Sequence, residues 1–283
     1  MFMENAVKIF VIESLEDGDR LTGTNLYNDL ISYELPLTSR LYNNIIDEGD
    51  WYGTMEDIKE NVQLGDVVFI HLEIHGNSRG SGIVLKNGTE ILFDRICEDF
   101  RVINKRIGCN LYVTLAVCHG LFLITGLVPL KEMPFCGVIG SQEQIKVKDL
   151  ELRFYEFYKS FLEFDDIEFA MEELQKANSG IPSSYKYVKP EDIFFNSWIS
   201  YLEISSDSDW QKKNTKNVSD ENCLNRRLRR EFDRKFKKER EKEANILFRE
   251  KAELFFMVKD FPENRKRFQI PNRATDVPKK KTS

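Results

Sequence analysis

The sequence predicts an α/β protein in which helices flank a mostly parallel central sheet, with a basic helical extension at the C-terminal end. Three observations support this fold class. Short continuous apolar runs alternate with longer amphipathic segments, as in parallel sheets whose strands are covered on both faces. A chain of 283 residues with 41% hydrophobic residues can bury a full core. The charge is also divided unevenly, because residues 211–283 carry 23 Lys and Arg against 12 Asp and Glu.

The expected strands are the uninterrupted apolar runs. Buried parallel strands are predicted at residues 7–12, 67–74, 111–117 and 135–140. Two apolar runs on either side of Asn87-Gly88 predict a tight hairpin between the second and third of these strands, because this dipeptide favours the turn that hairpins need. The apolar stretch 193–204 is interpreted as a further edge strand.

The segments between these strands are predicted to be helices. They are expected at residues 25–31, 54–62, 94–106, 121–129, 149–164 and 165–176. Thr54 and Asp94 are the expected N-caps of the second and third helices, since their side chains can accept hydrogen bonds from the first turn. The last two segments have apolar residues at helical spacing, so each should bury one face.

The C-terminal part differs in composition from the rest. The whole chain has a net charge of −6, and residues 211–283 contribute 23 minus 12, or +11, which leaves −17 for residues 1–210. We therefore expect a domain at residues 1–205, a polar linker at 206–218 and a basic helical extension at 219–283. The extension has one narrow apolar stripe with a residue at every fourth position: Leu224, Leu228, Phe232 and Phe236.

Three roles are open for this extension. It can be a solvated helix laced with salt bridges, since acids such as Glu231 and Asp233 are interleaved with the bases. It can bind nucleic acid by releasing counterions. It can also dock, through charge attraction and the apolar stripe, on the acidic first part of the chain or on a regulatory protein partner. A protein partner is favoured over nucleic acid because of the interleaved acids.

Cysteine usage and the N-terminal segment indicate a cytoplasmic protein. The five cysteines are odd in number and lack CxxC spacing, which is typical of reduced thiols. The N-terminal segment carries Glu4 and has too short an apolar stretch for a secretory signal, and no run reaches membrane-spanning length. No cofactor and no metal are expected: His71, Glu73, His75 and His119 share a region, but their spacing matches no closed zinc signature.

Reactive residues stand at the ends of two expected strands. His75-Gly76 ends the strand that begins at residue 67, and Cys118-His119-Gly120 ends the next long strand. Carboxyl ends of parallel strands meet at one edge of a sheet, so both groups should lie there. An imidazole beside a thiol suggests nucleophilic catalysis, in which the imidazole takes the thiol proton and the thiolate attacks an acyl carbon. Glycine allows close backbone approach, so the amides of Gly76 and Cys118 are candidate oxyanion donors.

The segments VVFIHLEIHG, LYVTLAVCHG and FCGVIGSQEQIKVKDL, in this order, resemble the caspase-like cysteine proteases, a group that includes caspases, metacaspases and bacterial CHAT domains. The resemblance covers roughly residues 5–205 and is sharpest at the HG and CHG motifs. It implies a caspase-like three-layer fold with His75 as general base, Cys118 as nucleophile, and the amides of Gly76 and Cys118 as oxyanion donors. The stretch FYEFYKSFLEFDDIEFAMEEL resembles the bacterial branch, whose members often act in immune or cell-death systems.

The chain also departs from the family pattern. The segment after Cys118 has no room for a long cleavable linker, so activation by cutting into two subunits is not expected. Ala116 stands where metacaspases carry an acidic residue, and His119 stands where animal caspases carry arginine. The resemblance therefore leaves the cleavage preference open. Glu73 and Glu143 lie near strand ends and are the candidate substrate-binding residues for a basic side chain.

The predicted function is that of a cysteine endopeptidase that uses Cys118 and His75 to cleave a protein partner, with bacterial defence or regulated cell death as the setting that the resemblance implies. His119 is expected to tune the thiolate without being essential. The alternative belongs to a different class: a catalytically inactive caspase-like scaffold whose basic extension binds a partner protein or nucleic acid.

Overall fold

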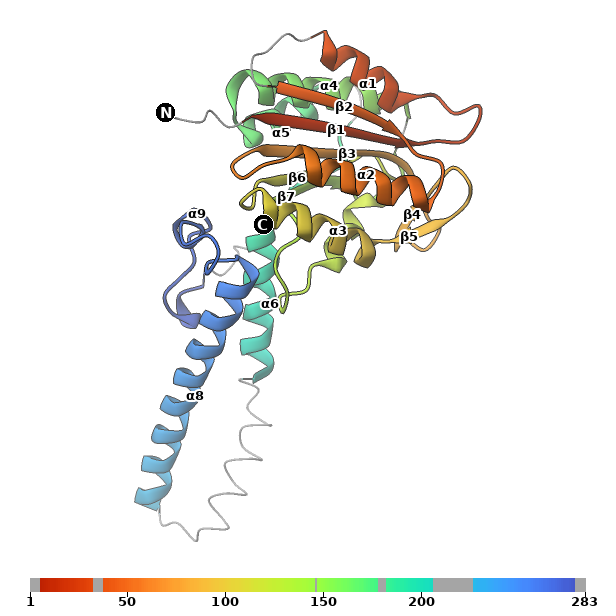
Figure 1. Cartoon of the computed structure of the whole chain (residues 1–283). Coiled ribbons are helices and arrows are strands. Elements are labelled where there is room, and N and C mark those ends of the chain that lie inside the picture. Colours follow the sequence, from red (N-terminus) through yellow and green to blue (C-terminus); the bar gives the residue numbers. More distant parts are fainter. Residues whose placement is uncertain (1–5, 33–37, 146, 178–181, 206–225, 278–283) are drawn as a thin grey trace, which may run out of the picture. The chain divides into compact units, whose positions relative to one another are not determined.

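The computed structural model describes residues 6–32, 38–145, 147–177, 182–205 and 226–277 (Figure 1). The chain forms two compact units, which are described separately here. The first unit comprises residues 1–128 and 133–190, and the second comprises residues 129–132 and 191–283. The main division therefore falls at Pro190, earlier than the boundary at residue 205 that composition predicts.

A mostly parallel sheet forms the centre of the first unit. Its strands are β1 (Val7–Ser14), β2 (Thr38–Asn44), β3 (Val67–Gly76), β6 (Leu111–Leu115), β7 (Gly137–Ser141) and β8 (Tyr185–Val188). They lie in the order β2-β1-β3-β6-β7-β8, with β8 antiparallel to β7 and the other neighbours parallel. The hairpin of β4 (Gly82–Val84) and β5 (Glu90–Leu92) pairs antiparallel with the end of β3, and its turn contains Asn87-Gly88 as predicted.

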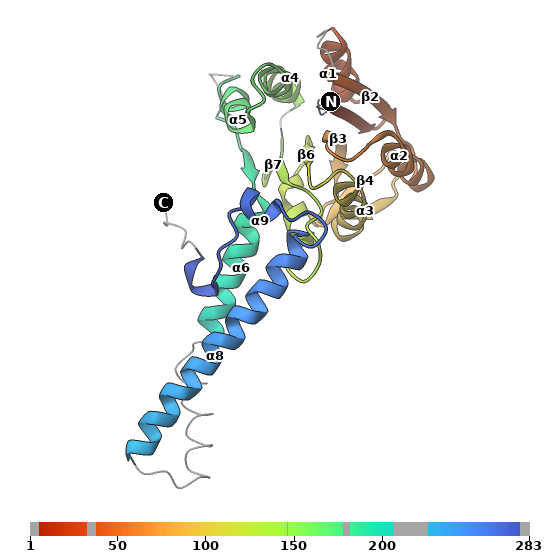
Figure 2. The same cartoon turned by 60° about the vertical axis from the view of Figure 1, so that its left-hand side comes forward.

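Helices cover both faces of this sheet. On one face lie α1 (Thr22–Ile31), α4 (Val147–Phe164) and α5 (Ile167–Lys176), and on the other lie α2 (Glu48–Asn61) and α3 (Phe93–Arg106), as Figure 2 shows. A 3₁₀ helix (Gly120–Gly126) follows β6. This arrangement confirms the predicted α/β class, with a mostly parallel sheet flanked by helices.

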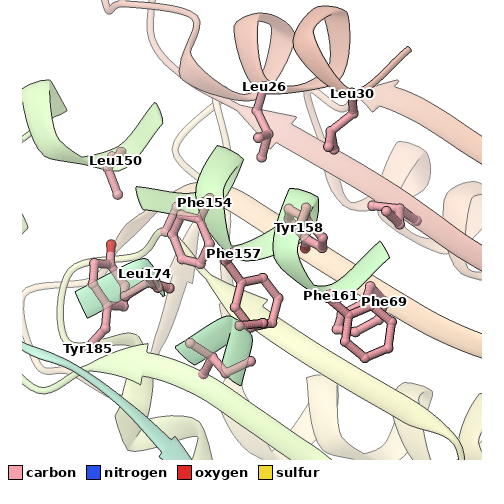
Figure 3. Close-up of a cluster of buried hydrophobic side chains, with 14 of the residues drawn as sticks. Leu26, Leu30, Phe69, Leu150, Phe154, Phe157, Tyr158, Phe161, Leu174 and Tyr185 are labelled. Carbon is pink, nitrogen blue, oxygen red and sulfur yellow. The ribbon is translucent and has the colours of Figure 1, made fainter. Parts of the chain in front are cut away.

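Aromatic side chains dominate the core between the sheet and α1, α4 and α5 (Figure 3). Phe69 of β3 lies at its centre, with its ring centroid 4.7 Å from that of Phe161 and 5.6 Å from that of Tyr158, both in edge-to-face geometry. Edge-to-face pairs gain about 1 kcal/mol each beyond the burial of their area. Leu26 and Leu30 bring α1 onto the same core.

The opposite face of the sheet has its own buried layer. Trp51 of α2 and Phe100 of α3 are fully buried, with ring centroids 6.4 Å apart. The Trp51 indole nitrogen donates a hydrogen bond of 3.0 Å to Asp99, so the one polar atom of this side chain is paired. The alternate residues of β1 and β3, such as Phe10 and Ile70, supply the sheet side of this layer because successive strand residues point to opposite faces.

Several predictions about elements are wrong. Asp94, the expected N-cap of the third helix, lies inside α3, which begins at Phe93. The helix predicted to start at Thr54 begins at Glu48, because Asp47 is the true N-cap and accepts a hydrogen bond from the Asp50 amide at 3.0 Å. The strands β2 and β8 were not predicted, since their sequences, TSRLYNN and YKYV, lack the apolar runs of buried strands. Both lie at sheet edges, where such runs are not required.

The predicted edge strand at 193–204 is instead part of helix α6 (Pro190–Ser205), in the second unit. Proline is favoured at the first helical position, and the acids Glu191 and Asp192 in the first turn complement the helix dipole. Aromatic residues at helical spacing then give α6 a buried face: Phe194, Phe195 and Trp198. A continuous apolar run does not by itself distinguish a strand from a buried helix.

The rest of the second unit packs on this aromatic face. Helix α8 (Arg226–Phe255) contributes Phe248, whose ring centroid lies 5.1 Å from that of Trp198, and Phe255, at 5.0 Å from Phe194. The chain then folds back through the short helix α9 (Asn264–Arg267) and a 3₁₀ turn (Ala274–Asp276). Leu224 and the predicted linker lie outside the described residues, as do the side chains of Leu228, Phe232 and Phe236.

Within the described ranges, every helix is too short or too polar to cross a lipid bilayer.

Candidate active site

The candidate site lies at the edge of the sheet where four parallel strands end. The chain leaves β1 at Ser14, β3 at Gly76, β6 at Leu115 and β7 at Ser141. Because these strands run in one direction, the segments that follow them gather at the same edge, where open α/β sheets place their active sites. Both predicted catalytic residues belong to these segments.

The register of β3 and β6 brings the segment that carries His75 next to the segment that carries Cys118. The pairing keeps a constant offset of 43 residues, from Val68 opposite Leu111 to Leu72 opposite Leu115. His75 and Cys118 are separated by the same 43 residues and lie three positions beyond the last pair of the ladder, Leu72 and Leu115. The two segments do stay in contact there, because a Cβ added to Gly76 would lie only 2.2 Å from the Cys118 carbonyl oxygen.

A tight turn follows Cys118. His119 has a φ of 57°, the left-handed conformation, which costs a non-glycine residue about 1 kcal/mol or more. The turn is closed by the Gly120 amide, which donates to the Val117 carbonyl at 2.9 Å. His119 is also tied to the segment after β7: its amide donates to the Glu143 carbonyl at 3.1 Å, and its Nδ1 lies 2.7 Å from the Gln142 carbonyl oxygen. These bonds hold the strained residue next to the sulfur.

Cys118 differs from the other described cysteines in exposure. It is partly accessible, whereas Cys97, Cys109 and Cys136 are buried. Burial raises the pKa of the Cys97 thiol to about 12, so that side chain stays protonated at neutral pH. Cys97, Cys109 and Cys136 therefore pack as small apolar residues, and only Cys118, among the described thiols, is placed to react.

His75 is held by a carboxylate that the sequence analysis did not identify. The His75 Nε2 lies 2.8 Å from Oδ2 of Asp19, in the loop between β1 and α1. The hydrogen bond from His75 lowers the pKa of the Asp19 carboxyl, more than its slight desolvation raises it. Both side chains are about half exposed, with 49% and 38% of their surface accessible, so the pair lies in a solvent-filled part of the site.

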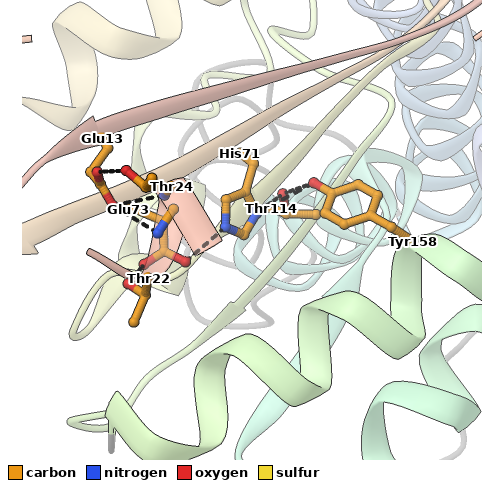
Figure 4. A network of polar contacts seen from close by, with 8 residues as sticks. Glu13, Thr22, Thr24, His71, Glu73, Thr114 and Tyr158 are labelled. Atoms are coloured by element: carbon orange, nitrogen blue, oxygen red, sulfur yellow. Dashed lines mark hydrogen bonds and ion pairs between the residues drawn. The ribbon is translucent and has the colours of Figure 1, made fainter. Parts of the chain in front are cut away.

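A buried polar network, shown in Figure 4, lies behind His75 on the same face of β3. His71 is fully buried, with Nε2 3.0 Å from a Glu73 oxygen and Nδ1 2.8 Å from the Thr114 hydroxyl. The Thr114 hydroxyl lies 2.6 Å from that of Tyr158, and the Thr22 hydroxyl donates to Glu73 at 2.8 Å. Each side chain of this network is therefore hydrogen-bonded to another member of the network.

The placement of Glu73 argues against its predicted role in substrate binding. Its side chain is 1% exposed and accepts hydrogen bonds inside the network, so it does not present a carboxylate to a substrate. The neighbouring Glu13, in register with Glu73 on β1, is equally buried and accepts a hydrogen bond from the Gly23 amide at 2.7 Å. Glu13 thereby supplies the first turn of α1 with the acceptor that its own N-cap residue lacks.

Glu143, the other candidate for substrate binding, lies in a different setting. Its side chain is exposed. Glu143 belongs to the segment after β7, and the carbonyl groups of this segment accept hydrogen bonds from His119. The Glu143 amide itself receives support from the Ser141 hydroxyl, which lies 2.9 Å away and accepts its hydrogen. The exposed carboxylate therefore belongs to the segment whose backbone contacts the turn after Cys118.

No cluster of three or more potential metal-ligating side chains occurs among the residues that the structure describes. His71 and Glu73 lie together, but His75 turns to Asp19 and His119 to the β7 segment, so the four residues considered from the sequence do not converge.

Asp19 is the site residue that sequence reasoning missed. The loop after the first strand is acidic in sequence, and the parallel topology places it at the same sheet edge. Four acids lie close together there, Glu13, Glu16, Asp17 and Asp19. Nothing in their spacing indicates which one reaches the histidine, because that depends on how the loop folds.

No protein-family model matches this sequence, and no curated protein matches it. Among solved structures, it is similar to the Drosophila initiator caspase Dronc, with a TM-score of 0.48 and 12% identity, covering 65% of this chain and 79% of that one. It is also similar to protein GSU0716 from Geobacter sulfurreducens, with a TM-score of 0.40 and 7% identity, covering 65% of this chain and 92% of that one. Likenesses of this strength say nothing about activity.

Proposed function

We propose that this protein is a caspase-like cysteine endopeptidase, with Cys118 as nucleophile and His75 as general base. The observation that supports the proposal is the contact between the segments of His75 and Cys118 at the sheet edge, where Cys118 is partly accessible and the imidazole is half exposed. A thiol and an imidazole within hydrogen-bonding reach form the pair that activates sulfur for attack on a carbonyl group.

The reaction follows from these two groups. The Cys118 proton passes to His75, and the thiolate sulfur attacks the carbonyl carbon of the scissile peptide bond. The carbon–nitrogen bond then breaks, and the departing amine takes the proton from His75, which leaves a thioester on Cys118. Water, deprotonated by His75, attacks the thioester carbon, the carbon–sulfur bond breaks, and the released Cys118 thiolate takes the proton back from His75. We assign stabilisation of the oxyanion to two backbone amides. One belongs to Gly76, the residue after the base, and the other to Cys118, in the turn that carries the nucleophile and is called the nucleophile turn below.

Labelling with a peptidyl acyloxymethyl ketone tests the proposal, because this probe reacts with a thiolate in a peptide-binding cleft. We expect one label per chain, at Cys118, and none in Cys118→Ala. His75→Ala should slow labelling by at least about 100-fold, the usual contribution of a general base, whereas His119→Ala should slow it less. Cys136→Ala is the matched control, since it removes a buried thiol and should leave labelling unchanged. Labelling of His75→Ala at the native rate would refute the proposed dyad.

We further propose that Glu143 contacts a basic side chain of the substrate near the cut. Its support is position: an exposed carboxylate in the segment that contacts the nucleophile turn. A panel of peptides that differ only at the residue before the cut tests this role, with Glu143→Gln as the variant. We expect a loss of preference for Arg or Lys at that residue in Glu143→Gln. Equal cleavage of all peptides by both forms would contradict it.

The setting in bacterial defence or regulated cell death, and a regulatory partner for residues 219–283, stay proposals that rest on the resemblance and on the charge of this region. The labelling experiment also separates the protease from the inactive scaffold, because a scaffold would leave Cys118 unlabelled.

A further inference from the structure

The loop between β1 and α1 forms a rigid support for one carboxylate. It starts beside β3, since Ser14 of β1 is in register with Ile74, the residue before His75. The loop then turns back on itself: the Asp19 amide donates to the Glu16 carbonyl at 3.1 Å, and the Glu16 amide donates to Asp19 Oδ2 at 3.0 Å. Asp19 is therefore held by its own loop at the place where its carboxylate meets the imidazole.

Two other charged residues of this loop are paired elsewhere. Asp17 forms an ion pair of 2.6 Å with Lys86, and the Arg20 guanidinium donates to Glu151 at 2.9 Å. Of the charged side chains in the loop, Asp19 is thus the one that contacts His75. This division of partners makes Asp17 a close control for Asp19, because both are exposed carboxylates of the same turn.

The contact determines which ring nitrogen carries a proton. A carboxylate that is ionised can only accept, so the proton between Asp19 and His75 belongs to Nε2. The lowered pKa of the Asp19 carboxyl, caused first by its hydrogen bond with His75, agrees with an ionised acceptor at neutral pH. Nδ1 is then the nitrogen with a lone pair, and it is the one available to take a proton from a thiol.

We infer that Asp19 is a positioning residue that completes a Cys118–His75–Asp19 triad, an inference that rests on the proposed protease function. Asp19 holds the imidazole in the tautomer with its proton on Nε2 and orients Nδ1 towards the sulfur. When the Cys118 proton passes to Nδ1, the resulting imidazolium lies against the carboxylate, which stays ionised throughout. The departing amine later takes the Nδ1 proton, so Asp19 neither gains nor loses one.

The tautomer of His75 tests this role without any substrate. Imidazole nitrogens with and without a proton have well-separated ¹⁵N shifts, and the chain contains only three histidines, so His75 can be identified by the signal lost in His75→Gln. We expect the Nε2-protonated form in the native protein and in Asp17→Asn. In Asp19→Ala the acceptor for Nε2 is lost, so the fraction of the Nδ1-protonated form should rise. An unchanged His75 spectrum in Asp19→Ala would overturn the inference.

The alkylation rate of Cys118 by iodoacetamide supplies the second readout. Asp19→Asn and Asp19→Ala should slow alkylation at pH 7 by about tenfold or more, since the free energy of a hydrogen bond to a charged group corresponds to a factor of about ten or more. Asp19→Glu should recover part of the native rate, and the control Asp17→Asn should react at the native rate. Equal rates in all four variants would also overturn the inference. If the native protein fails to react with the peptidyl probe while His75 still shows the expected tautomer, the protease proposal fails and the Asp19–His75 pair stands.

Discussion

Gly76 is the position at which a single methyl group should separate the base from the nucleophile. A Cβ at this residue would lie 2.2 Å from the Cys118 carbonyl oxygen, whereas real Cβ atoms essentially never approach closer than 3.0 Å. The obstacle is backbone and not the end of a flexible side chain. Gly76→Ala must therefore move one of the two segments by at least 0.8 Å, the difference between these distances.

This displacement has two measurable consequences. Overpacking of this kind costs about 1–3 kcal/mol of stability. A misplacement of about 1 Å between reacting groups costs about 100-fold in rate. Gly76→Ala should accordingly show a lower urea midpoint and an about 100-fold slower reaction of Cys118 with the peptidyl probe, measured well below the unfolding transition.

Gly53→Ala is the matched control. Gly53 lies in helix α2, and a Cβ there meets no atom within 4 Å. Alanine in a helix is favoured over glycine by about 1 kcal/mol, so this variant should be slightly more stable, with an unchanged labelling rate. If Gly76→Ala keeps both the native stability and the native labelling rate, the two segments are not in contact and the reasoning about the site is refuted.

Three further predictions concern stability. Glu73→Ala removes the acceptor of two buried hydrogen bonds and should lower the free energy of unfolding by about 3 kcal/mol in urea titrations, and a loss below about 1 kcal/mol would contradict the network. Burial and the nearby Glu13 raise the pKa of Tyr42 to about 12, so its stabilising contribution is present below pH 10 and is lost as the pH rises towards 12. The stability difference between native protein and Tyr42→Phe should shrink across that interval, and a constant difference would contradict the shift. In the second unit, Phe248→Ala should cost about 3 kcal/mol, and the exposed Ile246→Ala under about 0.5 kcal/mol; equal losses would contradict the packing of α8 on α6.

Much of the sheet could be predicted because its central strands are covered on both faces. Residues 67–74 and 111–117 are continuous apolar runs for that reason, and the structure places β3 and β6 there. The edge strands β2 and β8 could not be predicted in this way, since one side of each is open and little apolar surface is needed. The run at 193–204 was wrongly assigned to a strand, because a short apolar run fits a buried helix as well as it fits a strand.

Sequence alone indicated that an imidazole and a thiol stand at the carboxyl ends of two parallel strands, and parallel strand direction suffices to bring such ends to one edge. The tertiary structure decided what each polar residue of β3 does. His71, Glu73 and His75 alternate onto the same face, but α1 and α4 cover the first two and stop short of the third. The first two are consequently locked in a buried network, and His75 is left to meet Asp19. Alternation is a local property that sequence records, whereas the reach of a helix across that face depends on packing between distant parts of the chain.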